Sequence, residues 1–372
     1  MIGTSLFNQG AEYVLATLAR GMAAHGHDVT VILSKYHEDW QHEHPDWKPF
    51  ELGENVEVII QDRHRARQSL FSLRKLFKKG RYDIVLCHSC PYTIILAILT
   101  FIMPTRPLFV NVVHGGFCGM DSNGNKIKPC FSVMGLIHKW LYARLDAQFA
   151  VSDGTSNGIN RITGYPRDRI FTVYNPVIDD SFFMKLNSKP DHVWLNQSDI
   201  PVVIAAGAFC SVKNHRMLLH AWAEVTSRIK ARLIIFGEGG LRAEYEELIQ
   251  KLGVGDSVSL PGFTNNLPAA LKNAACFVVS SLAESFSIVL VEALASGTPV
   301  VSTNCPYGPA EILQNGKYGI LVENNDSAEL ADGIVQVLEG KGIVPTYESF
   351  DRFTVEAIVN RYEQAMESVL FK

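Results

Sequence analysis

Short apolar runs alternate with amphipathic segments along the whole chain. The runs are rich in β-branched residues and lack a strict alternation of apolar and polar positions, which is typical of strands covered on both faces. In the segments between them, apolar residues recur at helical spacing. Repeated strand–helix units of this kind predict an α/β fold built on parallel sheets. The clearest predicted strands are Val29–Leu33, Ile84–Leu86, Phe109–Val113, Phe149–Val151, Phe171–Tyr174, Val202–Ala206, Leu233–Phe236, Val258–Leu260, Phe277–Val279 and Val300–Ser302.

This alternation is interrupted at residues 178–200, where the chain is polar. We interpret the segment as a linker between two domains, because 372 residues exceed the size of one ordinary hydrophobic core. The prediction is a first Rossmann-like domain at residues 1–177 and a second one at residues 201–345. The last helix, residues 354–372, is expected to pack back on the first domain. Residues 1–7 can supply only a very short first strand.

The composition narrows the class of protein. Apolar residues make up 47% of the chain and charged residues 19%, as in a soluble globular protein. The formal net charge of −4 argues against a protein that binds nucleic acid through its overall charge. Seven cysteines, an odd number spread over a long chain, favour a reducing compartment over a disulfide framework. The first residues lack the features of a signal peptide, so we expect a cytoplasmic protein.

Candidate binding residues follow the predicted strands of the second domain, where ligands bind in open parallel sheets. Gly207 follows the first of these strands and permits a close backbone approach, and Lys213 lies near the start of the next helix. A helix N-terminus together with an ammonium group suits an anion. Gly237 begins a second glycine turn after the next strand. Each glycine turn taken singly is equally consistent with an ordinary connection.

A stronger signal comes from two glutamates, Glu284 and Glu292. Glu284 follows a predicted strand, and Glu292 lies one or two turns inside an apolar helix, where a carboxylate needs a hydrogen-bonding partner. Sugar hydroxyls are suitable donors, because an ionised carboxylate only accepts. At the start of this helix the backbone amides of Phe286, Ser287 and Ile288 are expected to point toward an anion.

These residues stand in an order that resembles a known family. The second half contains F-G-E-G from Phe236, L-P-G-F from Leu260, the pair Glu284 and Glu292, A-S-G-T-P-V-V from Ala295 and C-P-Y-G-P-A-E from Cys305. The first half contains G-A-E from Gly10, V-H-G from Val113, V-S from Val151 and N-P from Asn175. Over nearly the whole chain, this set resembles the family 4 retaining glycosyltransferases of bacterial cell-surface polysaccharide type. The resemblance implies the GT-B fold, in which two Rossmann-like domains with parallel sheets face a central cleft.

The resemblance assigns roles to the candidate residues. Glu292 would hold the ribose hydroxyls of the nucleotide, Glu284 would bind hydroxyls of the donor sugar, and Lys213 would neutralise the diphosphate. The backbone near Gly262 and Phe263 would meet the base. The implied catalytic residues are His114, Lys213 and Glu284. The implied donor-binding residues are Gly10, Gly207, Lys213, Gly237, Gly262, Phe263, Glu284, Ser285, Phe286, Ser287, Ile288 and Glu292.

His114 ends a predicted strand of the first domain, where the resemblance places it against the transferred sugar. The other interpretation is a satisfied histidine beneath a loop. The implied reaction is transfer of a hexosyl group from a nucleotide-sugar donor with retention of configuration, and UDP-sugars are expected from their frequency in the family. The leaving phosphate oxygen would take the acceptor proton, so neither a metal nor a cofactor is expected. A saccharide or lipid-linked saccharide of cell-surface polysaccharide or lipopolysaccharide biosynthesis would be the acceptor.

The chain departs from the family pattern in three places. Ala208 stands where an arginine is usual, which removes a bidentate contact to the diphosphate. Ser285 and Ser287 stand in a loop that often carries glycines, and the first strand is nearly missing. The alternatives are another GT-B enzyme, either a sugar-nucleotide epimerase or a phosphorylase, and a degenerate protein that binds nucleotide sugars without turnover. A dehydrogenase is disfavoured, because no G-x-G-x-x-G opens the first helix.

The segment Arg63–Arg81 is basic and has apolar residues at helical spacing. Such a helix can lie on anionic lipid, which would place the protein peripherally on the cytoplasmic face of the inner membrane. An ordinary solvated surface helix explains the pattern at least as well. The basic residues are Arg63, Arg65, Arg67, Arg74, Lys75, Lys78, Lys79 and Arg81, and the apolar residues are Leu70, Phe71, Leu73, Leu76 and Phe77.

Overall fold

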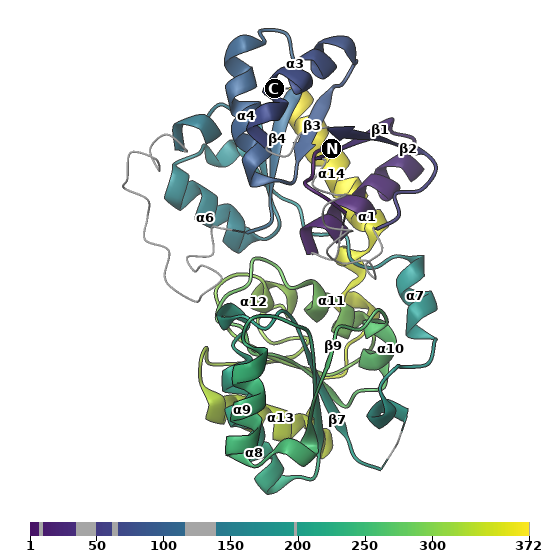
Figure 1. The fold of residues 1–372 in the computed structure, drawn as a ribbon, viewed down its shortest axis with the longest axis vertical. Coiled ribbons are helices and arrows are strands. Elements are labelled where there is room, and N and C mark those ends of the chain that lie inside the picture. The colour runs from purple at the N-terminus through teal and green to yellow at the C-terminus, as the bar shows by residue number, and fades with distance from the viewer. Residues whose placement is uncertain (7–9, 35–49, 62–65, 116–138, 197–198, 372) are drawn as a thin grey trace. The chain divides into compact units, whose positions relative to one another are not determined.

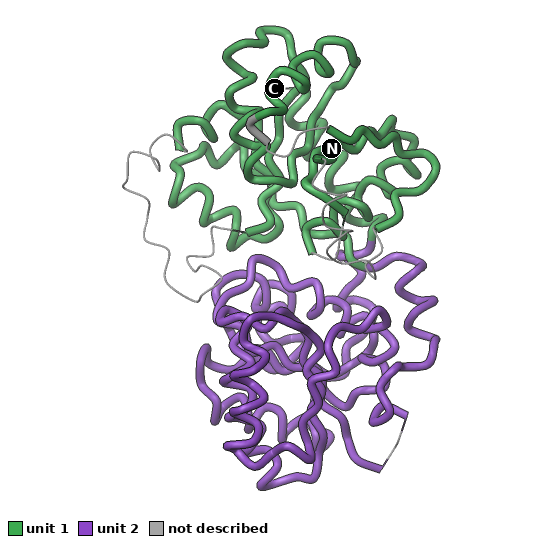
Figure 2. Tube along the Cα trace, viewed as in Figure 1, with its two compact units in different colours: residues 1–117, 128–177, 355–372 green, residues 118–127, 178–354 purple. Residues whose placement is uncertain are grey.

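The structure is a computed structural model, and its described residues form two compact units (Figures 1 and 2). Unit 2 consists of residues 178–354, and unit 1 consists of the described residues before and after it. Within the described residues, the chain therefore passes once from unit 1 to unit 2 and once back. The described residues are 1–6, 10–34, 50–61, 66–115, 139–196 and 199–371.

Unit 1 is built on parallel strands. They are β1 (Val29–Ser34), β2 (Val56–Gln61), β3 (Ile84–Cys87), β4 (Leu108–Val113), β5 (Ala147–Ala150) and β6 (Ile170–Thr172). β1 pairs with β2, and β3 to β6 pair in sequence order. Ile2 forms single parallel bridges to Ile32 and to Cys87, and its side chain is completely buried. One residue at the start of the chain thus links the two groups of strands, in the position of the very short first strand.

Helices cover the unit 1 strands, and the last helix of the chain is among them. The helices are α1 (Gly10–Ala24), α3 (Leu70–Lys79), α4 (Cys90–Ile102), α6 (Asp153–Thr163) and α14 (Val355–Leu370). α14 packs against α1, and a Cβ atom at Gly21 of α1 would lie 2.7 Å from the Val359 side chain of α14. The absence of a side chain at Gly21 lets the two helices approach closely.

Unit 2 contains a second parallel sheet. Its strands are β7 (Val202–Ala206), β8 (Arg232–Phe236), β9 (Val258–Gly262), β10 (Cys276–Val279), β11 (Val300–Thr303) and β12 (Ile320–Val322). They lie in the order β12-β11-β10-β7-β8-β9. Since all neighbours are parallel, the loops that follow the strands emerge at one edge of the sheet.

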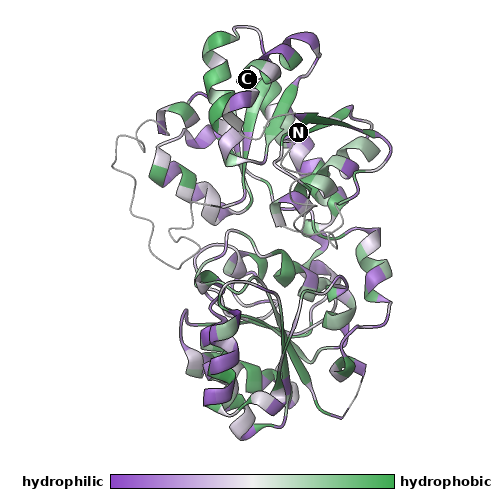
Figure 3. Ribbon diagram, viewed as in Figure 1, coloured by the Kyte–Doolittle hydropathy of each residue, from purple (hydrophilic) through white to green (hydrophobic). Residues whose placement is uncertain are grey.

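Five helices connect these strands, a sixth follows the last strand, and together they bury the sheet. They are α8 (His215–Arg228), α9 (Arg242–Leu252), α10 (Leu267–Lys272), α11 (Ile288–Ala295), α12 (Pro309–Ile312) and α13 (Ser327–Gln336). The side chains of α8, α9 and α13 share one core with the strands, centred on Trp222 and Tyr245, which are almost completely buried. Figure 3 shows the result of this burial: the strands are mostly apolar, and polar residues lie on the helices.

Residues 178–200, interpreted above as a linker, belong to unit 2 and are partly helical. α7 (Asp180–Leu186) begins where the Asp179 carboxylate accepts a hydrogen bond from the Phe182 amide, and the Phe182 ring is buried. A single 3-10 turn follows at Val193–Asn196. A helix of seven residues contains too few apolar positions for their spacing to reveal it.

Candidate functional site

The loops after β7 and β8 are in close contact at the carboxyl edge of the unit 2 sheet. Gly237 has φ +149°, and a Cβ atom there would lie 1.9 Å from the Gly207 carbonyl oxygen. Gly239 has φ +155°, and a Cβ atom there would lie 2.6 Å from the Phe209 carbonyl oxygen. The Phe209 amide donates to the Glu238 carbonyl at 2.8 Å. Both glycines are therefore required by the close approach of the two loops.

Lys213 and Glu284 meet at this edge. The Lys213 Nζ atom donates to Glu284 Oε1 at 2.6 Å, and the Ser281 hydroxyl donates to the same oxygen at 2.7 Å. Lys213 ends the 3-10 turn that precedes α8, and its carbonyl oxygen accepts from the Ser280 hydroxyl at 2.9 Å. The aliphatic part of Lys213 passes over Gly207, where a Cβ atom would touch it at 3.4 Å. The loops after β7 and β10 are thereby fixed to each other.

The ion pair is largely shielded from solvent. The Lys213 side chain is 26% exposed and the Glu284 side chain 10%. Burial works to lower the pKa of Lys213, but the charge and hydrogen bond of Glu284 outweigh burial and raise that pKa above its usual value. Glu284 accepts a hydrogen bond from one of the three N–H groups of the ammonium group. The carboxylate thus fixes the position of Lys213, which keeps N–H donors for an anion.

The loop from Glu284 to α11 carries backbone strain. Ser287 has φ 125° and ψ 84°, a conformation that favours glycine, and its buried hydroxyl has no hydrogen-bond partner among the described residues. The amides of Ser287 and Ile288 donate to no group in the described part of the chain, as expected at a helix start. Phe286 is buried against Phe353, with ring centroids 5.5 Å apart. Only the backbone of Phe286 can therefore contact a ligand.

Glu292 lies in the second turn of α11 and is half-buried. Its carboxylate forms no hydrogen bond or ion pair with the residues that the structure describes. Burial raises the pKa of Glu292 to about 7, and the more distant charge of Lys185 lowers it by less. An acid whose pKa is raised this strongly is a common mark of a functional site.

The remaining unit 2 candidates lie on the same loops. Gly262 ends β9 with φ +90°, and its carbonyl oxygen accepts from the Gly237 amide at 2.9 Å. The Phe263 ring is 54% exposed, so it offers an apolar surface at this edge. Ser285 is half-buried, and Ala208 is exposed. The structure thus brings all unit 2 residues of the predicted set to one edge.

Gly10 and His114 belong to unit 1. Gly10 is the exposed first residue of α1, and His114 directly follows β4. His114 Nε2 lies 2.9 Å from Nδ1 of His88, the residue that directly follows β3. The sequence analysis missed His88, although its place after a strand next to β4 could have indicated it.

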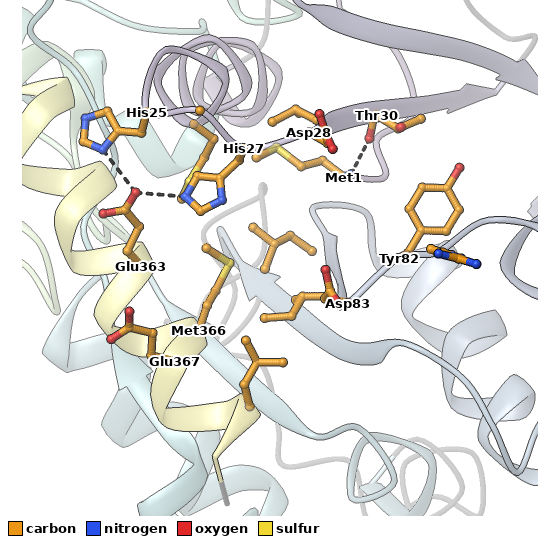
Figure 4. Close-up of a pocket in the computed structure, with 17 residues that line it drawn as sticks. Met1, His25, His27, Asp28, Thr30, Tyr82, Asp83, Glu363, Met366 and Glu367 are labelled. Carbon is orange, nitrogen blue, oxygen red and sulfur yellow. Dashed lines mark hydrogen bonds and ion pairs between the residues drawn. The ribbon is translucent and has the colours of Figure 1, made fainter.

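A concave region of unit 1 lies at the opposite edge of its sheet (Figure 4). The segments before β1 and β3 line it together with α14. In it, the Glu363 carboxylate binds the rings of His25 at 3.1 Å and His27 at 2.9 Å, which ties α14 to the end of α1. None of the predicted site residues lines this pocket. Since ligands of parallel sheets bind at the carboxyl edge, we place the candidate site at the loops of unit 2.

Among the residues that the structure describes, no three His, Cys, Asp or Glu side chains are grouped so that they could hold a metal ion.

Replacement of Ser287 by glycine should stabilise the protein, because glycine adopts φ 125° without steric strain. Strain of this kind costs roughly 1–3 kcal/mol, and Ser287→Gly also removes a buried hydroxyl without a partner. The measurement is the midpoint of urea unfolding. Ser285→Gly is the matched control, because Ser285 does not have a positive φ and glycine there should not stabilise the fold. Equal midpoints for Ser287→Gly and the wild type would contradict the strain.

The matching family models and the similar proteins described here are all glycosyltransferases. Residues 8–181 match the model of Glycosyltransferase Family 4, and residues 191–354 match the model of Glycosyl transferases group 1. An uncharacterized glycosyltransferase of Methanocaldococcus jannaschii is 27% identical over 94% of this chain and 93% of its own. The N-acetylgalactosamine-N,N'-diacetylbacillosaminyl-diphospho-undecaprenol 4-alpha-N-acetylgalactosaminyltransferase of Campylobacter jejuni is 32% identical over 147 residues, 40% of each chain.

Solved structures share the fold. Anabaena HepE, solved in complex with UDP and glucose, superposes with a TM-score of 0.73 over 99% of this chain and 98% of its own, at 20% identity. The two family models together span both units. The chain therefore belongs to the family 4 glycosyltransferases and has the GT-B fold.

Proposed function

We propose that this glycosyltransferase moves a hexosyl group from a nucleoside diphosphate sugar to a saccharide or lipid-linked saccharide. The expected donor series is that of UDP, and the expected setting is cell-surface polysaccharide biosynthesis. Transfer proceeds with retention of configuration and uses neither a metal nor a cofactor. The Anabaena relative bound to UDP and glucose supports the donor, and the diphospho-undecaprenol in the name of the Campylobacter relative supports a lipid-linked acceptor.

The observation that carries this proposal is the arrangement at the carboxyl edge of unit 2. An ammonium group oriented by Glu284 lies on the same edge as the open amides at the start of α11, and both suit a diphosphate. Glu292 supplies a carboxylate whose burial is relieved when hydroxyl groups donate to it. The exposed Phe263 offers a face on which a base can stack. One ligand has all three chemistries, a nucleoside diphosphate with its ribose.

The reaction that we propose takes place at the anomeric carbon of the donor sugar. The bond between the anomeric carbon and the phosphate oxygen breaks, and the acceptor oxygen bonds to the anomeric carbon on the same face. The proton of the acceptor hydroxyl passes to the departing phosphate oxygen. Lys213 and the amides of Ser287 and Ile288 stabilise the negative charge that grows on the diphosphate. Ala208 leaves Lys213 as the only basic side chain of residues 207–214, so it carries this role there alone.

Contact with an anionic membrane is the second part of the proposal, and the structure narrows the surface that could make it. Arg63 and Arg65 lie outside the described residues. The apolar side of α3 is used internally, because Leu73 and Phe77 are buried in the unit 1 core. Phe71 is 77% exposed, and lysines around it on α3 face solvent. No helix among the described residues is long and apolar enough to cross a bilayer. The contact we propose is therefore Phe71 with Lys75, Lys78 and Lys79.

Substitution of Lys213 should separate its chemical role from its structural one. We expect Lys213→Met to lower the rate of transfer from UDP-sugars about 10²–10³-fold, as for loss of one donor to a developing anion. It also leaves Glu284 buried without its cation, which lowers stability. The double variant Lys213→Met/Glu284→Gln should recover stability but not the rate. Rates are measured with UDP-, GDP- and ADP-sugars, beside thermal unfolding.

The control for this substitution is Lys230→Met, an exposed lysine with the same change in charge. It should change neither the rate nor the thermal midpoint. Transfer by Lys213→Met at the wild-type rate would remove the assigned role. Thermal stabilisation of the wild type by none of the three nucleotide series would contradict donor binding itself.

Glu292→Gln should stabilise the ligand-free protein at high pH only. The pKa of Glu292 lies near 4.5 in the unfolded chain and near 7 in the folded protein, so ionisation opposes folding increasingly between these values and fully above pH 7. The neutral amide avoids this cost. We expect the thermal midpoint of the variant to exceed that of the wild type by several degrees at pH 8, and by little at pH 4.5. An equal difference at both pH values would show that burial does not raise the pKa of Glu292.

Membrane contact is tested by sedimentation with vesicles. We expect Phe71→Ser/Lys75→Gln/Lys78→Gln to bind phosphatidylglycerol vesicles roughly tenfold or more weakly than the wild type, because each lysine contributes about 1 kcal/mol near such a surface. Binding of the wild type should fall with added salt. Lys251→Gln/Lys272→Gln, two exposed lysines of unit 2, is the control for charge. Equal binding of both multiple variants would remove the assigned surface.

A further inference from the structure

Two histidines form a pair at the carboxyl edge of the unit 1 sheet. His88 and His114 each directly follow a strand, and these strands, β3 and β4, are parallel neighbours. The centroids of their rings lie 5.1 Å apart, and the ring planes are inclined by 29°. Nδ1 of His88 lies 2.9 Å from Nε2 of His114, a hydrogen-bond distance. The backbone of His88 is held as well, because its amide donates to the Ile2 carbonyl at 2.9 Å.

Both rings are neutral near pH 7. Burial lowers the pKa of His114 to about 4. Burial and then the neighbouring His114 hold the pKa of His88 well below its usual value. A neutral imidazole has one N–H group and one nitrogen that only accepts. The bond between the two rings therefore contains one proton, which belongs either to His88 Nδ1 or to His114 Nε2.

The second nitrogen of His88 decides between these arrangements. His88 Nε2 is buried and has no hydrogen-bond partner among the described residues. If His114 were the donor, His88 would carry its proton on Nε2 and bury an N–H group without an acceptor. If His88 is the donor, its Nε2 buries only a lone pair. Buried N–H groups without a partner are rarer than unpaired acceptors, so His88 is the donor.

We propose that His88 is a positioning residue that holds His114 as the neutral tautomer with its proton on Nδ1. In this state the Nε2 lone pair of His114 is occupied by His88, and His114 can present only an N–H donor. This N–H group can donate to a hydroxyl oxygen of a bound sugar, and in this respect the inference rests on the proposed function. His114 in this tautomer cannot act as a general base, because it keeps no free lone pair that could accept a proton. This agrees with a mechanism in which the leaving phosphate takes the acceptor proton.

The tautomer can be observed directly in the ligand-free protein. Long-range ¹H–¹⁵N correlation spectra of protein labelled with ¹⁵N-histidine distinguish a protonated Nδ1 from a protonated Nε2, and His114→Gln identifies the signals of His114. We expect protonated Nδ1 and unprotonated Nε2 for His114 in the wild type. His88→Phe should move the proton of His114 toward Nε2. His88→Asn, whose amide can donate from the position of Nδ1, should keep it on Nδ1.

Kinetics give the second readout. His88→Phe should lower kcat roughly tenfold, the value of one neutral hydrogen bond, and His88→Asn should restore most of this loss. Protonated Nε2 on His114 of the wild type would overturn the proposal, whatever the rates. The spectra need no donor, so the predicted tautomer in a protein without transfer activity would leave the positioning role intact and reject the proposed function. Transfer activity with the opposite tautomer would reject the positioning role alone.

Discussion

Lys213 and Glu284 stand 71 positions apart in the sequence, and their charged atoms lie 2.6 Å apart in the fold. The parallel sheet makes this possible, because β7 and β10 are neighbours that end at the same edge. Loops that hold the two partly buried charges together are needed because a buried charge without its partner destabilises the fold strongly. Gly207 lies against the Lys213 side chain, and the glycines at 237 and 239 let the loop after β8 approach the loop that leads to Lys213. The precision of the site thus depends on residues that have no side chain.

The structural features that could be predicted are those that depend on local patterns in the sequence. Strand positions followed from apolar, β-branched runs, and the family and the GT-B fold predicted from the ordered motifs are confirmed by the family models and the solved relatives. Strand ends also located the candidate residues, because a parallel sheet collects the loops after its strands at one edge. The roles assigned to His114, Lys213, Glu284 and Glu292 stay predictions.

What the sequence could not reveal depends on contacts between distant residues. Lys213 and Glu284 were assigned to different groups of a donor, and only the fold shows that they bind each other. Ser287 was recognised from the sequence as a departure from a loop that often carries glycines, but only its φ shows that the backbone there has a conformation that glycine favours. In the sequence, His88 is only a histidine that follows a strand, and the fold alone shows that His114 lies beside it. The helix α7 escaped notice because it is short and its one buried aromatic side chain, Phe182, shows no period.

The return of the chain to unit 1 has a consequence for how such proteins can be recombined. Ile178 and Thr354, the first and last described residues of unit 2, form a parallel bridge, and the Ile178 amide donates to the Phe353 carbonyl at 3.3 Å. Within the described residues, the chain therefore enters and leaves unit 2 at adjacent positions, as in a domain inserted into another domain. The corresponding unit of a relative could replace it through two junctions that lie side by side. Unit 1, by contrast, is assembled from both ends of the chain, so no single cut isolates it.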